Sequence, residues 1–214
     1  MKTIKIDLKN NYDIAIEKAA KVLEKGGTIV FPTETVYGLG ANALNESAVE
    51  QVFNIKRRPP SKPVPIVARN LTWVKELAYI HPKLEKPLGQ IWPSATTVIL
   101  PKRDIIPWIT TAKQNSIGIR VPEYAFINKL LAKFGYPLTA TSANISGMPA
   151  TGNIDDIKKM FGPDSVWRPD LIIDAGNLPP NQPSTILDLT TIRPRITRVG
   201  AVKPEELMRI LGVQ

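Results

Sequence analysis

The chain has 214 residues, of which 43% are apolar and 22% are charged, a composition typical of a folded globular protein. The absence of cysteine excludes disulfides, thiolate metal sites and a cysteine nucleophile, and a single histidine argues against a histidine-dependent triad. The formal net charge of +9 favours a polyanionic partner, although a lysine-rich surface without a specific partner would give the same net charge. The sequence has neither a bilayer-length apolar run nor a signal peptide, which predicts a cytoplasmic protein without membrane contact.

Helical and strand patterns alternate from the N-terminus. Apolar residues at helical spacing predict a first helix that ends at the glycines 26–27, and a strand at 28–31 follows. Ser47 and Glu50 match a capping box, which predicts the start of a second helix. The apolar run 63–68 predicts a short strand, and its prolines indicate a sheet edge or an irregular start.

The rest of the chain continues this alternation. The lone histidine, His81, is expected to lie in a loop or to cap a helix that Pro87 breaks. Further helices are predicted at 71–78, 81–92, 125–135, 154–162 and 203–212, and strands at 96–101, 116–122, 138–143, 171–176, 184–190 and 195–200. Because some consecutive strands lack a crossover helix, the sequence predicts an α/β fold with one open, twisted mixed sheet flanked by helices. We expect residues 1–214 to form a single domain.

Two glycine-containing patterns could suggest nucleotide binding. The stretch "GLGANA" at 38–43 matches Gly-x-Gly-x-x-Ala, but the dinucleotide fingerprint requires its first glycine directly after a strand, and "PTETVY" intervenes. The chain also lacks the Gly-x-x-x-x-Gly-Lys-Ser/Thr pattern of a P-loop. If the protein binds ATP, it therefore does so without either motif.

The segment "KRRPPSK" at 56–62 places four cations in seven residues at the end of a predicted helix. Basic side chains interact favourably with a helix C-terminus, which would account for one or two of them. The paired prolines stiffen the segment, and Arg and Lys are the side chains that bind phosphate. The sequence leaves both interpretations open.

Two strands carry polar residues that suggest ligand contacts. The stretch 138–147 runs from an apolar strand into Ser142 and Asn144, which is either an ordinary turn or an anion site at a strand end. Arg120 lies inside an apolar strand, where an unpaired charge is seldom tolerated. Its partner is either an internal carboxylate or the carboxylate of a ligand.

Taken together, several stretches resemble the YrdC-type threonylcarbamoyl-AMP synthase family. They are "PTETVYGLGANA", "KRRPPSKP", "GIRVP", "TSANISGMPA", "PSTILDL" and "RVGAV", and they occur in this order over nearly the whole chain. The resemblance implies the single-domain form of a YrdC-like fold with a basic concave face. It also implies a nucleotidyltransferase that converts L-threonine, bicarbonate and ATP into threonylcarbamoyl-AMP and pyrophosphate, the first step of tRNA threonylcarbamoyladenosine modification.

Residue roles follow from the same resemblance. It implies a threonine site at Thr33, Arg120, Ala140 and Ser184, and an ATP site at Lys56, Arg58, Ser116, Ser142, Asn144, Ala150 and Arg198. Mg²⁺ is expected on the ATP phosphates, without protein side chains as metal ligands. No catalytic acid or base is assigned, and charge neutralisation and alignment are expected to supply most of the catalysis.

The resemblance extends to partners and leaves two rival functions. A downstream tRNA threonylcarbamoyl-transferase complex would receive the product, and direct RNA contact is an open expectation. One rival is an RNA-binding module that uses phosphate contacts alone, although the sequence lacks an aromatic stacking motif. The other is a carbamoyl-transfer protein on the same fold, against which Arg120 and Thr33 favour an amino-acid substrate.

Overall fold

The computed structural model describes residues 1–163 and 165–213. Its helices are α1 (Asp13–Glu24), α2 (Glu46–Lys56), α3 (Leu71–Leu77), α4 (Pro82–Ile91), α5 (Ala125–Phe134), α6 (Ile154–Met160) and α7 (Pro204–Ile210). Its strands are β1 (Lys2–Lys5), β2 (Ile29–Phe31), β3 (Gly38–Gly40), β4 (Ile66–Val67), β5 (Thr96–Pro101), β6 (Ser116–Arg120), β7 (Leu138–Thr139), β8 (Thr141–Ser142), β9 (Leu171–Asp174), β10 (Thr185–Asp188) and β11 (Arg195–Arg198). Within these described residues, no helix combines the length and the apolar character needed to cross a bilayer.

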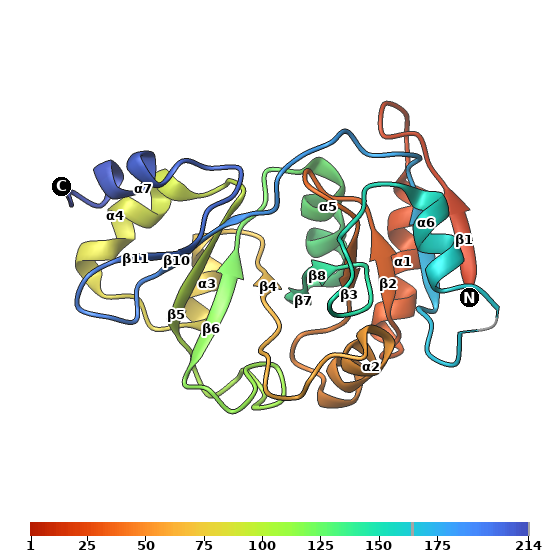
Figure 1. The fold of residues 1–214 in the computed structure, drawn as a ribbon, viewed down its shortest axis with the longest axis horizontal. Coiled ribbons are helices and arrows are strands. Elements are labelled where there is room, and N and C mark those ends of the chain that lie inside the picture. Colours follow the sequence, from red (N-terminus) through yellow and green to blue (C-terminus); the bar gives the residue numbers. More distant parts are fainter. Residues whose placement is uncertain (164, 214) are drawn as a thin grey trace.

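The strands form two mixed sheets, which occupy two halves of the molecule (Figure 1). The first sheet has the order β1-β9-β2-β3-β8, and the second has the order β11-β10-β5-β6-β4-β7. The α/β class and the mixed strand directions predicted from the sequence are confirmed, but the strands divide between two sheets instead of forming one.

Helices cover both faces of the first sheet. Alternate residues of a strand point to opposite faces, so Ile29 and Phe31 of β2 pack with α1 and α5. Val30 between them points the other way and packs with α2 and α6. The result is a three-layer arrangement with a core on each side of the sheet.

In the described residues, helices cover one face of the second sheet. Val98 of β5 and Ile117 and Ile119 of β6 are fully buried in a cluster that includes residues of α3, α4 and α7. The residues between them point to the opposite face, because side chains alternate along a strand. That opposite face carries the polar and small residues of β6 together with Thr97 and Ile99 of β5, and it borders the cavity described below.

The predicted strand 138–143 is divided between the two sheets. Residues 138–139 form β7 in the second sheet, and residues 141–142 form β8 in the first. Ala140 lies at the junction, where its N–H donates to the carbonyl of Pro65 at 2.8 Å. This segment therefore connects the sheets directly beside the start of β4.

Several local predictions are corrected by tertiary context. The second helix is capped by Asn45, which accepts from the N–H of Ala48, and not by a box at Ser47 and Glu50. Helix α4 continues through Pro87 to Ile91, so the predicted break is wrong. His81 is confirmed as the cap, since its Nδ1 accepts from the N–H of Lys83 at 3.3 Å. The short strands β1 and β3 were not predicted.

The glycines of "GLG" have a packing role. Gly38 and Gly40 lie in β3, which pairs with β2. A Cβ on Gly40 would lie 2.6 Å from the Phe31 ring and 3.0 Å from the Thr139 carbonyl oxygen. These positions therefore need glycine so that the Phe31 ring can lie against the strand, which agrees with the exclusion of a dinucleotide fingerprint.

Candidate active site

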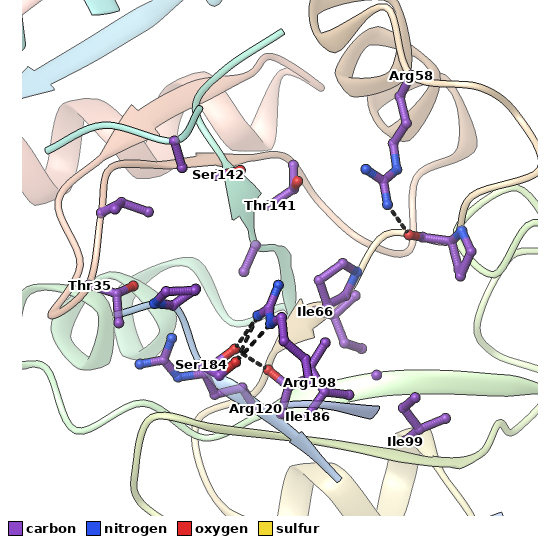
Figure 2. Close-up of a pocket in the computed structure, with 18 of the residues that line it drawn as sticks. Thr35, Arg58, Ile66, Ile99, Arg120, Thr141, Ser142, Ser184, Ile186 and Arg198 are labelled. Atoms are coloured by element: carbon purple, nitrogen blue, oxygen red, sulfur yellow. Dashed lines mark hydrogen bonds between the residues drawn. The ribbon is translucent and has the colours of Figure 1, made fainter. Parts of the chain in front are cut away.

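A cavity of about 500 Å³ lies where the two sheets meet. Its wall combines the turn after β2, the segment after α2, the open face of the second sheet and the turn after β8 (Figure 2). The volume lies within the ordinary range of small-molecule sites. It is therefore large enough to hold a nucleotide or an amino acid.

Strand β6 presents its polar side to this cavity. Ser116, Gly118 and Arg120 line the cavity, whereas Ile117 and Ile119 are buried on the helical face. This alternation follows from the two-residue period of side chains along a strand. The absence of a side chain at Gly118 leaves space beside Thr97, because a Cβ there would lie 3.2 Å from the Thr97 methyl carbon.

Arg120 has an internal partner. Its Nη2 donates to Glu34 Oε1 in the turn between β2 and β3, and its Nε donates to the Ser94 carbonyl at 3.1 Å. The Arg120 and Glu34 side chains are only 12% and 20% exposed. Of the two partners left open by the sequence, the structure shows the internal carboxylate. Arg120 still lines the cavity, where it extends toward Thr35 (Figure 2).

A second arginine lies at the exposed rim beside Ser184. Arg198 Nη2 donates to the Ser184 carbonyl at 2.8 Å and to the Ser184 hydroxyl at 3.1 Å. The same hydroxyl lies 2.8 Å from the Thr97 hydroxyl. Strands β5, β10 and β11 are thus tied together at the cavity wall by polar side chains that would also face a ligand.

The basic residues at the end of α2 point in different directions. Arg57 adopts left-handed backbone angles, with φ of 48°, at the helix C-terminus. Arg58 on one side of it lines the cavity and donates to the carbonyls of Lys62 and Pro63 at 3.0 and 2.7 Å. These bonds fix the guanidinium at the wall opposite Ser184 (Figure 2). Lys56, on the other side, turns inward.

Lys56 supports the turn after β8. Its side chain is 2% exposed, and Nζ donates to the carbonyls of Ser142 and Asn144 and to Asn144 Oδ1. Asn144 Oδ1 also accepts from the Ser142 hydroxyl, and Nδ2 donates to the Met148 carbonyl. Burial, and next the charge of Arg58, lower the pKa of Lys56 to about 7. Lys56 therefore holds the shape of the 142–148 turn that lines the cavity.

The cavity has an excess of positive charge. Arg58, Arg120 and Arg198 line it, and no Asp or Glu is among its lining residues in the described part of the chain. Burial lowers the pKa of all three arginines, and Arg120 lowers that of Arg198 further. Because an arginine in a protein does not lose its proton, these groups stay cationic and favour an anionic ligand.

The structure brings together most of the residues predicted for the two ligands. Thr33 and Lys56 do not line the cavity, so their contacts with ligands stay predictions. The Thr33 hydroxyl donates to the Val36 carbonyl and accepts from the N–H groups of Thr35 and Val36. The residues that do line it are Arg58, Ser116, Arg120, Ala140, Ser142, Asn144, Ala150, Ser184 and Arg198.

Sequence reasoning missed other parts of the wall. Thr35 and Val36 line the cavity next to Glu34, and Thr97 lies on the open face of β5. The strand alternation of β5 would have placed Thr97 on the polar face. No local pattern would have identified Glu34, because its partner lies 86 residues away.

Comparison with known proteins agrees with this arrangement. Residues 21–200 match the Sua5/YciO/YrdC family model, whose description reads telomere recombination. A Pyrococcus abyssi protein named threonylcarbamoyl-AMP synthase is 34% identical over 198 residues, which cover 92% of this chain and 57% of that protein. A Methanocaldococcus jannaschii relative is 35% identical over 205 residues, which cover 92% of this chain and 95% of that protein.

A solved structure has the same fold. The crystal structure of Pyrococcus abyssi Sua5 complexed with L-threonine superimposes with a TM-score of 0.88 at 32% identity, covering 99% of this chain and 60% of that one. This chain thus spans less than two thirds of the Pyrococcus abyssi protein. On the match to the family model and the identity to its relatives, the chain belongs to the Sua5/YciO/YrdC family.

Proposed function

We propose that the protein is an L-threonylcarbamoyladenylate synthase. It would convert L-threonine, bicarbonate and ATP into threonylcarbamoyl-AMP and pyrophosphate, which makes it a nucleotidyltransferase. The observation that carries the proposal is a cavity between the sheets with three arginines and no lining carboxylate within the described residues. Such a site suits ATP, bicarbonate and the carboxylate of threonine, and relatives that carry the synthase name support this choice.

The threonine side of the site would lie at Arg120. A guanidinium binds a carboxylate through charge-assisted hydrogen bonds, which also orient the ligand. Ala140 and Ser184 line the same region and would contact the amino acid. The turn that Thr33 stabilises forms the adjoining wall through Thr35 and Val36. The complex of Pyrococcus abyssi Sua5 with L-threonine supports this assignment.

The ATP side would lie between Arg58 and Arg198. Ser116, Ser142, Asn144 and Ala150 line this region, and Lys56 would act through the turn that it holds. In the reaction, the threonine amine loses a proton and bonds to the carbon of bicarbonate with loss of water. An oxygen of the resulting carbamate then attacks the α-phosphorus, and pyrophosphate leaves. Fixed cations stabilise the charge that develops on the phosphates and align the reactants.

Mg²⁺ is expected to accompany the nucleotide. It prefers oxygen ligands and commonly binds through substrate phosphates with only one or two carboxylates. The cavity offers no lining carboxylate in the described residues, so we propose that the triphosphate carries the ion. We further propose that the product passes to a tRNA threonylcarbamoyl-transferase complex.

A pyrophosphate-release assay tests the proposal. The protein is incubated with ATP, Mg²⁺, bicarbonate and L-threonine, and each component is omitted in turn. Pyrophosphate release that requires both threonine and bicarbonate is expected. Arg58→Met should lower the rate, whereas Arg193→Met, a change at an exposed arginine outside the cavity, should leave it unchanged.

The same assay separates the rival functions. An RNA-binding module would release no pyrophosphate under any of these conditions. A carbamoyl-transfer protein would require carbamoyl phosphate in place of threonine and bicarbonate. Release without threonine, or no release with all components present, would contradict the proposed function.

A further inference from the structure

The three arginines of the cavity suit carboxylates and phosphates, but an α-amino acid also carries an ammonium group. Three arginines line the cavity, and within the described residues no acidic side chain does. An ammonium placed among them would be repelled unless a carboxylate lay beside it. A site for an amino acid in this cavity therefore needs one acidic partner close to Arg120.

Glu34 is placed to be that partner. Its Oε1 accepts from Arg120 Nη2, and the next two residues along the chain, Thr35 and Val36, line the cavity. Its backbone is fixed from both sides. Thr33 Oγ1 accepts from the following N–H groups of the turn, and Asn181 Nδ2 donates to the Glu34 carbonyl at 2.8 Å.

The second carboxylate oxygen of Glu34 accepts no hydrogen bond in the part of the chain that the structure describes. Oε2 is buried and has no hydrogen-bond partner among the described residues. A buried charged oxygen without a donor is costly, so this position is suited to a donor from outside the protein. Because Oε2 is buried and Glu34 does not line the cavity, a donor in the cavity reaches Oε2 only when the last torsion of the glutamate turns; that torsion is soft, so no backbone movement is needed.

Arg120 retains donors for the other end of the same ligand. Its Nε and Nη2 are engaged by Ser94 and Glu34, and Nη1 makes no hydrogen bond within the described residues, which leaves it for a ligand carboxylate. In an α-amino acid, one carbon separates the carboxylate from the ammonium. A carboxylate on Nη1 would thus place the ammonium next to the carboxylate that Nη2 already holds.

We propose that Glu34 binds the α-ammonium of the amino-acid substrate, so that the Arg120–Glu34 pair recognises both charged groups of the substrate. This inference rests on the proposed function, since it specifies how the threonine site selects an amino acid. Glu34 makes the site selective for amino acids over 2-hydroxy acids of the same shape. Without it, the cavity would select only for a carboxylate.

Calorimetry with two ligands tests this role. L-Threonine is compared with the 2,3-dihydroxybutanoate of the same stereochemistry, in which a hydroxyl replaces the ammonium. The proteins are the wild type, Glu34→Gln, Glu34→Asp and the control Glu76→Gln, a change at an exposed glutamate outside the cavity. Thermal unfolding of each variant confirms that it is folded.

The wild type should prefer threonine. Glu34→Gln should weaken threonine binding by about tenfold or more, the scale of a hydrogen bond between charged groups, and leave the hydroxy acid within threefold. Glu34→Asp keeps the negative charge and should retain part of the preference. Glu76→Gln should behave as the wild type does.

Other results would overturn the inference. Tighter binding of both ligands by Glu34→Gln would mean that Glu34 only occupies the place of a ligand carboxylate. If Glu34→Gln weakened the binding of both ligands equally, Glu34 would act through Arg120. If binding stayed unchanged, Glu34 would have no role. A wild type that neither binds threonine nor releases pyrophosphate in its presence would instead refute the proposed function, and the inference with it.

Discussion

Replacing Lys56 with methionine tests two statements about this buried lysine. One is that it supports the turn after β8, and the other is that burial disfavours its charged form. Methionine has a similar length and fills similar space, but it has no donor and no ionisable group. The change leaves the carbonyls of Ser142 and Asn144 without the bonds that Nζ makes at present. Because each lost bond to a buried acceptor costs about 1–3 kcal/mol, the variant should be less stable than the wild type at alkaline pH.

The difference in stability should depend on pH. The pKa of Lys56 is lowered from 10.5 to about 7, so between these values the unfolded chain holds a proton that the folded chain does not. Stability rises with pH wherever the unfolded state binds more protons. From pH 7 to pH 9 the linkage relation gives a gain of about 2 kcal/mol for the wild type, which the methionine variant lacks.

Urea unfolding at pH 6, 7.5 and 9 measures this difference directly. The stability gap between the wild type and Lys56→Met should widen as the pH rises. Lys62→Met is the matched control, because Lys62 is exposed on the same segment and its replacement should show no such trend. A gap that stayed constant or narrowed with rising pH would refute the reasoning, since Lys56 would then keep its charge in the fold without penalty.

Three further predictions concern one arginine of the cavity and two backbone positions elsewhere in the fold. Arg58→Met should weaken ATP binding by about tenfold or more in calorimetry while thermal unfolding stays near that of the wild type, and unchanged ATP affinity would contradict its assignment. Gly40→Ala should destabilise the fold by about 1–3 kcal/mol in urea unfolding, because the new Cβ would lie 2.6 Å from the Phe31 ring; a wild-type midpoint would show that the ring moves freely. Arg57→Gly should stabilise the fold by about 0.5–1 kcal/mol, since glycine adopts left-handed angles without strain, and a loss of stability would indicate an unrecognised side-chain role.

Much of the fold was predictable because its signals are local. The apolar stripe of α1, the end of α5 at Gly135 and the alternation of β6 depend on residues within one or two turns or along one strand. Gly135 adopts left-handed angles with φ of 82°, as its position after the helix predicts. These features are fixed by periodicity and by the conformational freedom of glycine, which a single sequence displays directly.

The candidate site was predicted in part, and mostly through the resemblance to a known family. The placement of Arg120, Ser184 and Arg198 at one cavity agrees with that resemblance. The resemblance implies that Lys56 contacts ATP, but its side chain points into the 142–144 turn and not toward the cavity. A cation run in the sequence indicates charge, but it does not indicate which member is buried.

The sequence by itself determined that the chain forms an α/β fold, where its main helices and strands lie, and that Arg120 needs a partner. Only the tertiary structure decided that 138–142 divides between two sheets, that Lys56 is buried and that Glu34 pairs with Arg120. The physical reason is that periodicity reports which face of an element is buried. It does not report which distant segment covers that face, because that choice depends on how the two sheets pack around the cavity between them.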